Sequence, residues 1–402
     1  MTSRKATELI HHPYVPPPGF AAPQVGVYKA STVIFPSVAA LRARDWRTKS
    51  GYTYGLHGTP TTFQLEERIA TLEGGKHCLL VPSGLASIAC VNLALLRAGD
   101  EVLLPDNVYG PSKAMAEGEL THWGITHQLY DPMDPGDLQR KLSDRTKLVW
   151  VEAPGSVTME FPPLAHLVQL CRQRGITTAL DNTWGAGLAF NGFDLGTGAR
   201  STTGSGADIV VHALTKYPSG GGDVLMGSVV TRDDRLHEQI KLSHMRLGWG
   251  VGANDVEAVL RSLPSLVARY RAQDTSARQL AGWLRGRPEV AQVLHPALPG
   301  SPGHEHWQAL CGDDGLAAGL FSIVLHERYP SARVDAFCEA LALFKLGYSW
   351  GGPVSLVVPY DVHAMRPAGR WPHRGMLVRL SIGLEETDAL RADLEQALRT
   401  LG

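Results

Sequence analysis

A regular alternation of short apolar runs with longer amphipathic stretches fills residues 77–226 and constrains the fold more than any other feature of the chain. Runs that are apolar throughout are typical of strands buried on both faces. Such strands, separated by helices, predict an α/β fold with a mostly parallel sheet covered on both sides. We expect strands at residues 77–81, 101–104, 125–130, 147–151, 176–180, 208–211 and 224–226, and helices at 85–96, from about 112, at 137–142 and at 163–174.

The pattern changes beyond Gly252. A long amphipathic helical stretch at 254–284 is expected to kink or break at Pro264, which lacks the N–H that a helix interior needs. Shorter strands at 320–324 and 377–381 and a closing helix at about 386–398 complete a second, smaller α+β domain. The stretch before residue 55, rich in Pro and Gly, is expected to be an extended arm.

Composition narrows the possible partners. The 402 residues, 44% of them hydrophobic, suffice for a large core and a second domain. Lys+Arg 38 and Asp+Glu 39 nearly cancel, which removes the electrostatic argument for a nucleic-acid or anionic-membrane partner. No apolar run of about 18 residues occurs, and the first residues lack the apolar core of a signal peptide, so we expect a cytoplasmic protein. The cysteines form no CxxC pair and are expected to be reduced and mostly buried: Cys78, Cys90, Cys171, Cys311 and Cys338.

Polar or reactive side chains follow several of the predicted strands. Ser83 and Tyr109 come after the first two strands, and Glu152 and Asp181 come after two later ones. Lys216 comes shortly after the strand that ends near residue 211. Because the carboxyl ends of parallel strands lie along one edge of a sheet, where ligands bind in open α/β folds, these residues are expected to converge.

Two of these residues indicate a specific cofactor. A lysine amine can form a Schiff base with pyridoxal phosphate (PLP), and a carboxylate such as Asp181 can hold the pyridine nitrogen protonated, so that the ring withdraws electrons from a substrate carbanion. The turn at Ser83-Gly84-Leu85 precedes a helix, whose free N–H groups suit a phosphate, and Thr215 adds a hydroxyl. Taken singly, a lysine beside a strand is usually a surface residue and a serine at such a turn is usually a helix cap.

A charged residue inside an apolar strand indicates how a substrate could be held. Arg379 lies in Leu377-Val-Arg-Leu-Ser381, and its guanidinium fork matches an α-carboxylate; the alternative is a structural salt bridge. His304 and His306 resemble metal ligands, but they are two positions apart and have no further ligand nearby in the sequence, so we expect no metal.

Motifs along most of the chain resemble those of the Cys/Met-metabolism family of fold-type I PLP enzymes. The resemblance runs from about Gly26 almost to the C-terminus, and Tyr348-Ser-Trp-Gly351 is closer to the cystathionine β-lyase subgroup than to the γ-elimination and γ-replacement enzymes. The motifs are residues 54–61, 72–75, 152–160, 181–184, 215–217, 295–300, 347–352 and 379–385.

The resemblance implies roles for individual residues. Lys216 would be the Schiff-base lysine and proton shuttle, Asp181 the partner of the pyridine nitrogen, and Tyr109 a ring that stacks on the cofactor. Arg379, with Ser349 and Trp350, would hold the substrate carboxylate. The remaining cofactor contacts would come from Ser83, Gly84, Leu85, Thr183 and Thr215, and from Tyr54 of a neighbouring subunit, with Tyr348 beside the substrate.

Two positions depart from the family pattern. The family commonly has an arginine two positions after the tyrosine that corresponds to Tyr54, whereas this chain has Leu56, followed by His57. Ala213 stands where many members outside the β-lyase group have a phosphate-binding serine. The resemblance therefore predicts the identity of the cofactor. It does not predict how this chain holds the phosphate of that cofactor.

The resemblance implies a homotetrameric carbon–sulfur lyase that removes a β-thiolate from cystathionine or a related thioether and leaves pyruvate and ammonia. Cystathionine, cystine and S-alkyl cysteines remain open as substrates. The alternatives are γ-elimination or γ-replacement within the same family, and a non-catalytic scaffold on this fold. We expect an N-terminal arm at 1–55, a PLP-binding domain at 56–250 and a C-terminal domain at 251–402.

Overall fold

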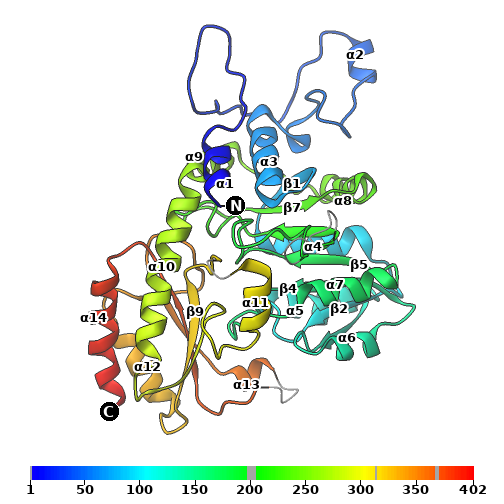
Figure 1. Ribbon diagram of the computed structural model, residues 1–402. Helices are drawn as coiled ribbons and strands as arrows, with labels where there is room; N and C mark the ends of the chain where they lie inside the picture. Colours follow the sequence, from blue (N-terminus) through cyan, green and yellow to red (C-terminus); the bar gives the residue numbers. More distant parts are fainter. Residues whose placement is uncertain (1, 197–204, 313–314, 367–370) are drawn as a thin grey trace.

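The computed structural model describes residues 2–196, 205–312, 315–366 and 371–402, which form a seven-stranded sheet and a five-stranded sheet with helices packed on both (Figure 1). We call the seven-stranded sheet with its helices the large-sheet part, and the five-stranded sheet with its helices the small-sheet part. The predicted α/β class is confirmed.

The large sheet has the order β1-β7-β6-β5-β4-β2-β3. Neighbouring strands from β3 through β6 are parallel, and β7 alone runs against its neighbours β1 and β6. The prediction of a mostly parallel sheet is therefore confirmed. The strands are β1 (His77–Val81), β2 (Glu101–Pro105), β3 (Thr126–Tyr130), β4 (Thr146–Glu152), β5 (Thr177–Asp181), β6 (Ile209–His212) and β7 (Gly227–Thr231).

The strand predicted at 224–226 was misplaced. The seventh strand is β7, which begins at Gly227 and carries the β-branched pair Val229 and Val230. Met226 is instead held by Thr215, whose N–H donates to the Met226 carbonyl at 3.2 Å and whose hydroxyl accepts the Met226 N–H at 3.0 Å. These two bonds occupy the Met226 backbone, so that the ladder with β1 and β6 starts one residue later.

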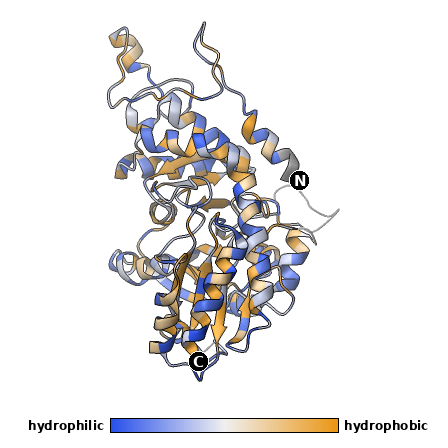
Figure 2. Ribbon diagram, turned by 90° about the vertical axis from the view of Figure 1, so that its left-hand side faces the viewer, coloured by the Kyte–Doolittle hydropathy of each residue, from blue (hydrophilic) through white to orange (hydrophobic). Residues whose placement is uncertain are grey.

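Alternating side chains of the large sheet enter two different cores. Cys78 and Leu80 pack on one face with α3, whereas Leu79 and Val81 pack on the other face with α4. This alternation places helices on both sides, and Figure 2 shows the strands as largely hydrophobic ribbons between more polar helices. The helices are α3 (Pro60–Glu73), α4 (Gly84–Leu95), α5 (Gly110–Met115), the π-helical turn η2 (Ala116–Leu120), α6 (Pro135–Lys141), α7 (Leu164–Gln173) and α8 (Asp234–Leu247).

The small sheet has the order β10-β11-β12-β9-β8 and one face covered by helices (Figure 1). Val378 and Leu380 of β12 pack toward that face, whereas Leu377 joins the core shared with the large-sheet part. Arg379 alternates with Val378 and therefore shares the side of Leu377. The strands are β8 (Val290–Leu294), β9 (Leu320–Leu325), β10 (Lys345–Leu346), β11 (Leu356–Tyr360) and β12 (Leu377–Ser381).

The helices of this region agree with the predicted break at Pro264. Helix α9 (Ala253–Ser262) passes through the 3₁₀ turn η4 (Leu263–Ser265) into α10 (Leu266–Leu284). The missing N–H of the proline accounts for the tighter turn. The other helices here are α11 (His304–Cys311), α12 (Ser331–Ala340), α13 (Val362–Met365) and α14 (Thr387–Leu398), followed by η5 (Arg399–Leu401).

The N-terminal segment is an arm with a helix at its start, which the sequence had not indicated. Helix α1 (Thr2–Ile10) packs against α3, η4 and α10, and Leu9 is buried. Lys5 fixes it by donating to the carbonyls of Leu72, at 2.7 Å, and Gly187. Beyond it, the chain with α2 (Val38–Arg42) projects from the body of the molecule (Figure 1). No helix in the described ranges is long and apolar enough to cross a membrane.

Candidate active site

Five residues selected from the sequence lie at one edge of the large sheet. Ser83, Tyr109 and Lys216 follow β1, β2 and β6, while Glu152 and Asp181 end β4 and β5. These five strands run in the same direction, so their carboxyl ends share the edge, as expected.

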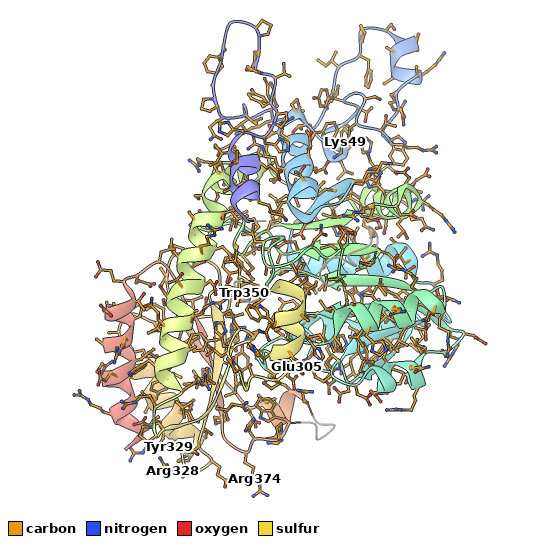
Figure 3. All side chains as sticks on the ribbon, viewed as in Figure 1. Lys49, Glu305, Arg328, Tyr329, Trp350 and Arg374 are labelled. Atoms are coloured by element: carbon orange, nitrogen blue, oxygen red, sulfur yellow. The ribbon has the colours of Figure 1, made fainter. Side chains whose placement is uncertain are left out.

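Lys216 connects this edge to the small-sheet part. Its Nζ donates to the Ser349 hydroxyl at 2.8 Å and lies 5.5 Å from the centre of the Trp350 ring. Trp350 lies near the centre of the view in Figure 3. Burial and the Arg379 cation lower the pKa of Lys216 to about 8, although Asp181 opposes the shift. A lysine with this pKa can exchange a proton near neutral pH.

Asp181 is held by the turn that follows β5. Its Oδ1 accepts the Thr183 N–H at 3.0 Å and the Thr183 hydroxyl at 2.5 Å. Burial raises the pKa of Asp181, while the hydrogen bonds from Thr183 and the nearby His212 act to lower it. A cation next to this carboxyl would stabilise its charged form.

A buried polar group lies behind Asp181 and had not been predicted. Glu73 of α3 accepts hydrogen bonds from Asn182, at 2.8 Å, and pairs with His212 Nδ1 at 2.7 Å. Glu73, Asn182 and His212 have no exposed surface. Since Asn182 follows Asp181 in the chain, the group fixes the backbone next to the site. The sequence signal was weak, because Glu73 and His212 are 139 positions apart.

Tyr109 lies over the same edge, in front of Glu152. The Tyr109 N–H donates to Glu152 Oε2 at 2.9 Å, which anchors the turn between β2 and α5. Burial and the charge of Asp181 hold the pKa of Glu152 well above its usual range. Burial, Asp181 and Glu152 raise the pKa of the Tyr109 phenol, although Arg379 opposes them.

The turn from β1 into α4 is narrow and was predicted to hold an anion. Ser83 caps α4, and its hydroxyl accepts the Ala86 N–H at 3.1 Å. The first N–H groups of the helix, from Gly84 and Leu85, have no carbonyl to bond within the helix. A Cβ on Gly84 would lie 2.5 Å from the Ala213 Cβ, so only glycine allows this approach of α4 to the end of β6. The Thr215 hydroxyl donates to the Met226 carbonyl at 3.2 Å in this structure.

Arg379 supplies a buried cation without a fixed counter-ion. It is 8% exposed and lies 5.4 Å from the Tyr360 ring, and no carboxylate of the described residues forms an ion pair with it. Burial lowers the pKa of Arg379, while Tyr360, Tyr348 and Tyr109 around it act to raise it. A structural salt bridge, the alternative for this residue, is therefore not found in the described chain. Tyr360 had not been predicted to belong to the site.

Ser349 and Trp350 are presented by a loop between β10 and β11. Ser349 has φ 133°, a backbone conformation that costs a non-glycine residue on the order of 1–3 kcal/mol. The Trp350 ring meets the buried Tyr217 at 5.5 Å. The loop is thus held against the turn that carries Lys216. Tyr348, in the same loop, is 81% exposed in the single chain.

Tyr54 lies on the arm rather than at the edge of the sheet. It is 48% exposed, and its ring meets His57 at 5.9 Å. Leu56 lines a small cavity with Lys241 and His244 of the same chain. Of these two α8 residues, Lys241 is the cation, because burial lowers the pKa of His244 and favours its neutral form.

An α/β fold with a lysine, a carboxylate and a helix N-terminus at one edge of a parallel sheet defines a class of PLP enzymes. Residues 6–399 match the sequence profile of the family described as "Cys/Met metabolism PLP-dependent enzyme". The chain belongs to this family, and its cofactor is PLP. The family and cofactor predicted from the sequence are confirmed.

Three known proteins show the range of this similarity. Cystathionine β-lyase MetC of Escherichia coli is 36% identical over 375 residues, covering 92% of this chain and 91% of that protein. The L-alanine/L-glutamate racemase of Wolbachia pipientis wMel is 31% identical, covering 93% and 92%. The crystal structure of metB from Corynebacterium glutamicum superposes with a TM-score of 0.85 at 27% identity, covering 99% and 98%.

Proposed function

We propose that this protein is a carbon–sulfur β-lyase that cleaves cystathionine, or a related cysteine thioether, to a thiol, pyruvate and ammonia. The observation that carries the proposal is the position of Lys216, whose amine lies against Ser349 and Trp350 and near the unpaired Arg379. This arrangement supports the proposal that Lys216 acts as the base and that Arg379 binds the carboxylate of the same substrate.

In this proposal each residue has one task. Bound PLP supplies an electron sink for the negative charge that develops at the substrate Cα. Asp181 would hold the pyridine nitrogen protonated, Tyr109 would stack on the ring, and Arg379 would orient the substrate carboxylate by a bidentate contact. The N–H groups of Gly84 and Leu85 would hold the phosphate. Ser83, Thr183, Thr215, Ser349, Trp350 and Tyr348 complete the walls of the site, with Tyr54 contributed by a neighbouring subunit.

Lys216 moves the proton. With a substrate bound, the neutral amine of Lys216 would take the proton from Cα, and the electrons of that bond would expel the thiolate from Cβ. The thiolate is protonated to a thiol, and the remaining enamine hydrolyses to pyruvate and ammonia. Each turnover therefore consumes one water and produces thiol and keto acid in equal amounts.

The test is product analysis with purified holoenzyme and L-cystathionine. We expect homocysteine and pyruvate in equal amounts by mass spectrometry, and no turnover by Lys216→Ala, which should also lose the visible absorption that borohydride bleaches in the parent. Dominant 2-oxobutyrate and cysteine would mean γ-elimination and would end the β-lyase proposal.

The racemase among the relatives calls for a second substrate in the same assay. Racemisation and elimination both begin with removal of the Cα proton, but racemisation breaks no bond at Cβ. We expect L-alanine to remain L-alanine under conditions where cystathionine is consumed. Rapid formation of D-alanine without thiol release from cystathionine would assign the site to racemisation instead.

We also propose a cytoplasmic homotetramer in which the arm of one subunit completes the site of another. The arm exposes large apolar residues that a single chain leaves in contact with water, among them Val15 and Ile34, each 91% exposed. Tyr54 and Leu56 would enter the neighbouring site with this arm. The division into an arm (1–55), a PLP-binding domain (56–250) and a C-terminal domain (251–402) belongs to the same proposal.

A further inference from the structure

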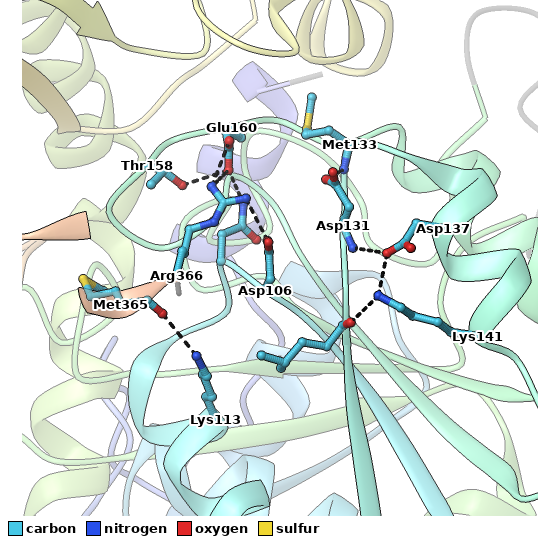
Figure 4. A network of polar contacts seen from close by, with 12 residues as sticks. Asp106, Lys113, Asp131, Met133, Asp137, Lys141, Thr158, Glu160, Met365 and Arg366 are labelled. Atoms are coloured by element: carbon cyan, nitrogen blue, oxygen red, sulfur yellow. Dashed lines mark hydrogen bonds and ion pairs between the residues drawn. The ribbon is translucent and has the colours of Figure 1, made fainter. Parts of the chain in front are cut away.

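A group of buried charges near the turn that carries Tyr109 joins the large-sheet part to the small-sheet part. Arg366 donates from Nη1 to both carboxylate oxygens of Glu160, at 3.0 and 2.8 Å, and from Nη2 to Asp106 at 2.9 Å (Figure 4). Arg366 is 4% exposed, Asp106 5% and Glu160 7%. Asn107 and Thr158 donate to Glu160 as well, at 2.7 and 3.0 Å. We call Arg366, Asp106 and Glu160 the clasp.

The clasp ties down the turn that carries Tyr109. Asp106 directly follows β2, three residues before Tyr109. On the other side of Tyr109, Lys113 of α5 donates to the Met365 carbonyl at 3.1 Å. Both flanks of the tyrosine are therefore fastened to one segment of the small-sheet part, residues 362–366.

The same segment begins at the cation of the proposed substrate site. Tyr360, at the end of β11, lies against Arg379, and α13 and Arg366 follow within six residues. A short stretch of chain thus connects the group that would bind the substrate carboxylate with the turn that would hold Tyr109 over the cofactor ring. Arg366, at the end of this stretch, is fixed by two carboxylates.

A buried ion group of this kind is a poor device for stability alone. Apolar residues of similar volume often stabilise a protein as well or better, because the charges lose their hydration. What a guanidinium fork between two carboxylates adds is a defined geometry. Asp106 and Glu160 lie on separate loops. A side chain that binds both carboxylates at once fixes the distance between them.

We propose that Arg366 is a positioning residue, which through Asp106 sets the orientation of Tyr109 over the cofactor and its spacing from Arg379. The consequence for substrate binding rests on the proposed function, whereas the consequence for the cofactor rests only on PLP binding. The two can therefore be measured separately.

The test compares Arg366→Met holoenzyme with Arg232→Met as a matched control. Arg232 also forms a bidentate pair, with Asp194 at 2.9 and 2.7 Å, but on the large-sheet part and outside the clasp. We expect Arg366→Met to change the visible circular dichroism of bound PLP and to raise KM for cystathionine about tenfold to a hundredfold, as for a displaced binding group. Arg232→Met should change neither, even if it lowers the melting temperature equally.

A cavity next to the clasp allows a rescue experiment. It has a volume of about 210 Å³ and is lined by Arg366, Asp106 and Lys113, among others. Methylguanidinium at millimolar concentration should restore the circular dichroism of Arg366→Ala, while tetramethylammonium at equal ionic strength should not. If Arg366→Met fails to fold, Asp106→Asn provides the same readout.

The outcomes separate the hypotheses. Unchanged visible circular dichroism in a folded Arg366 or Asp106 variant overturns the proposal, as does equal rescue by both cations. A changed dichroism in a protein that does not cleave cystathionine would support the clasp while rejecting the β-lyase function.

Discussion

Among single side chains, the proposed chemistry depends on the charges around Lys216. Burial and, to a smaller extent, the Arg379 cation favour the neutral form of Lys216, whereas Asp181 favours the protonated form, so that the pKa of Lys216 falls to about 8. The sequence identified all three residues, because each occupies a distinctive place at a strand. It could not identify Glu73 or Tyr360, whose position depends on contacts between distant segments rather than on a local pattern.

Arg379→Leu should affect both binding and protonation. The substrate carboxylate would lose its buried partner, and the fall in kcat/KM should correspond to about 2–5 kcal/mol of lost transition-state stabilisation. The pKa of Lys216 should rise, because the Arg379 cation no longer disfavours its protonated form. Since only the neutral amine removes a proton, the rise of kcat with pH should move to higher pH than in the parent.

The pH profile of kcat reports groups in the substrate complex and is the appropriate measurement. Arg391→Leu is the control. Arg391 is an exposed residue of α14, and its guanidinium lies over the ring of Trp283 in α10. A profile of Arg379→Leu that coincides with the parent would show that Arg379 does not act on Lys216.

Among helices and strands, the sequence predicted most of the large sheet because its strands are apolar and separated by regular helices. The error at β7 has a local cause, since the apolar residues 224–226 precede the strand and Met226 is bonded to Thr215. Strands β8, β10 and β11 were not predicted. β10 has two residues only, Gln292 interrupts the apolar run of β8, and Pro359 interrupts that of β11, so that none of the three has a regular strand pattern.

The close approach of α4 to β6 gives a test of the predicted phosphate site. Gly84→Ala would place a methyl group 2.5 Å from the Ala213 Cβ, and overpacking of this kind costs about 1–3 kcal/mol. We expect a lower melting temperature of the apoprotein and a larger dissociation constant for PLP. The double variant with Ala213→Gly removes the opposing methyl and should recover most of both. A single variant as stable and as tight as the parent would contradict this arrangement.

At the level of the assembly, the exposed apolar residues of the arm lead to a prediction about mass. Sedimentation should give four times the chain mass of 43.4 kDa for the parent. Ile34→Asp should produce smaller species and weaker PLP binding, because charge is unfavourable at an apolar contact and Tyr54 would leave the neighbouring site. Trp123→Asp, at a residue 45% exposed outside the arm, should remain a tetramer. A monomeric parent with full cofactor occupancy would reject the shared site.

The docking of α1 has a consequence for how the chain folds during synthesis. Lys5 and Leu9 find their partners on α3, on the turn at Gly187 and on the segment from η4 into α10. The last of these is synthesised more than 250 residues after α1. The contact of α1 with α3 can form early, whereas its docking against η4 and α10 is a late event in maturation.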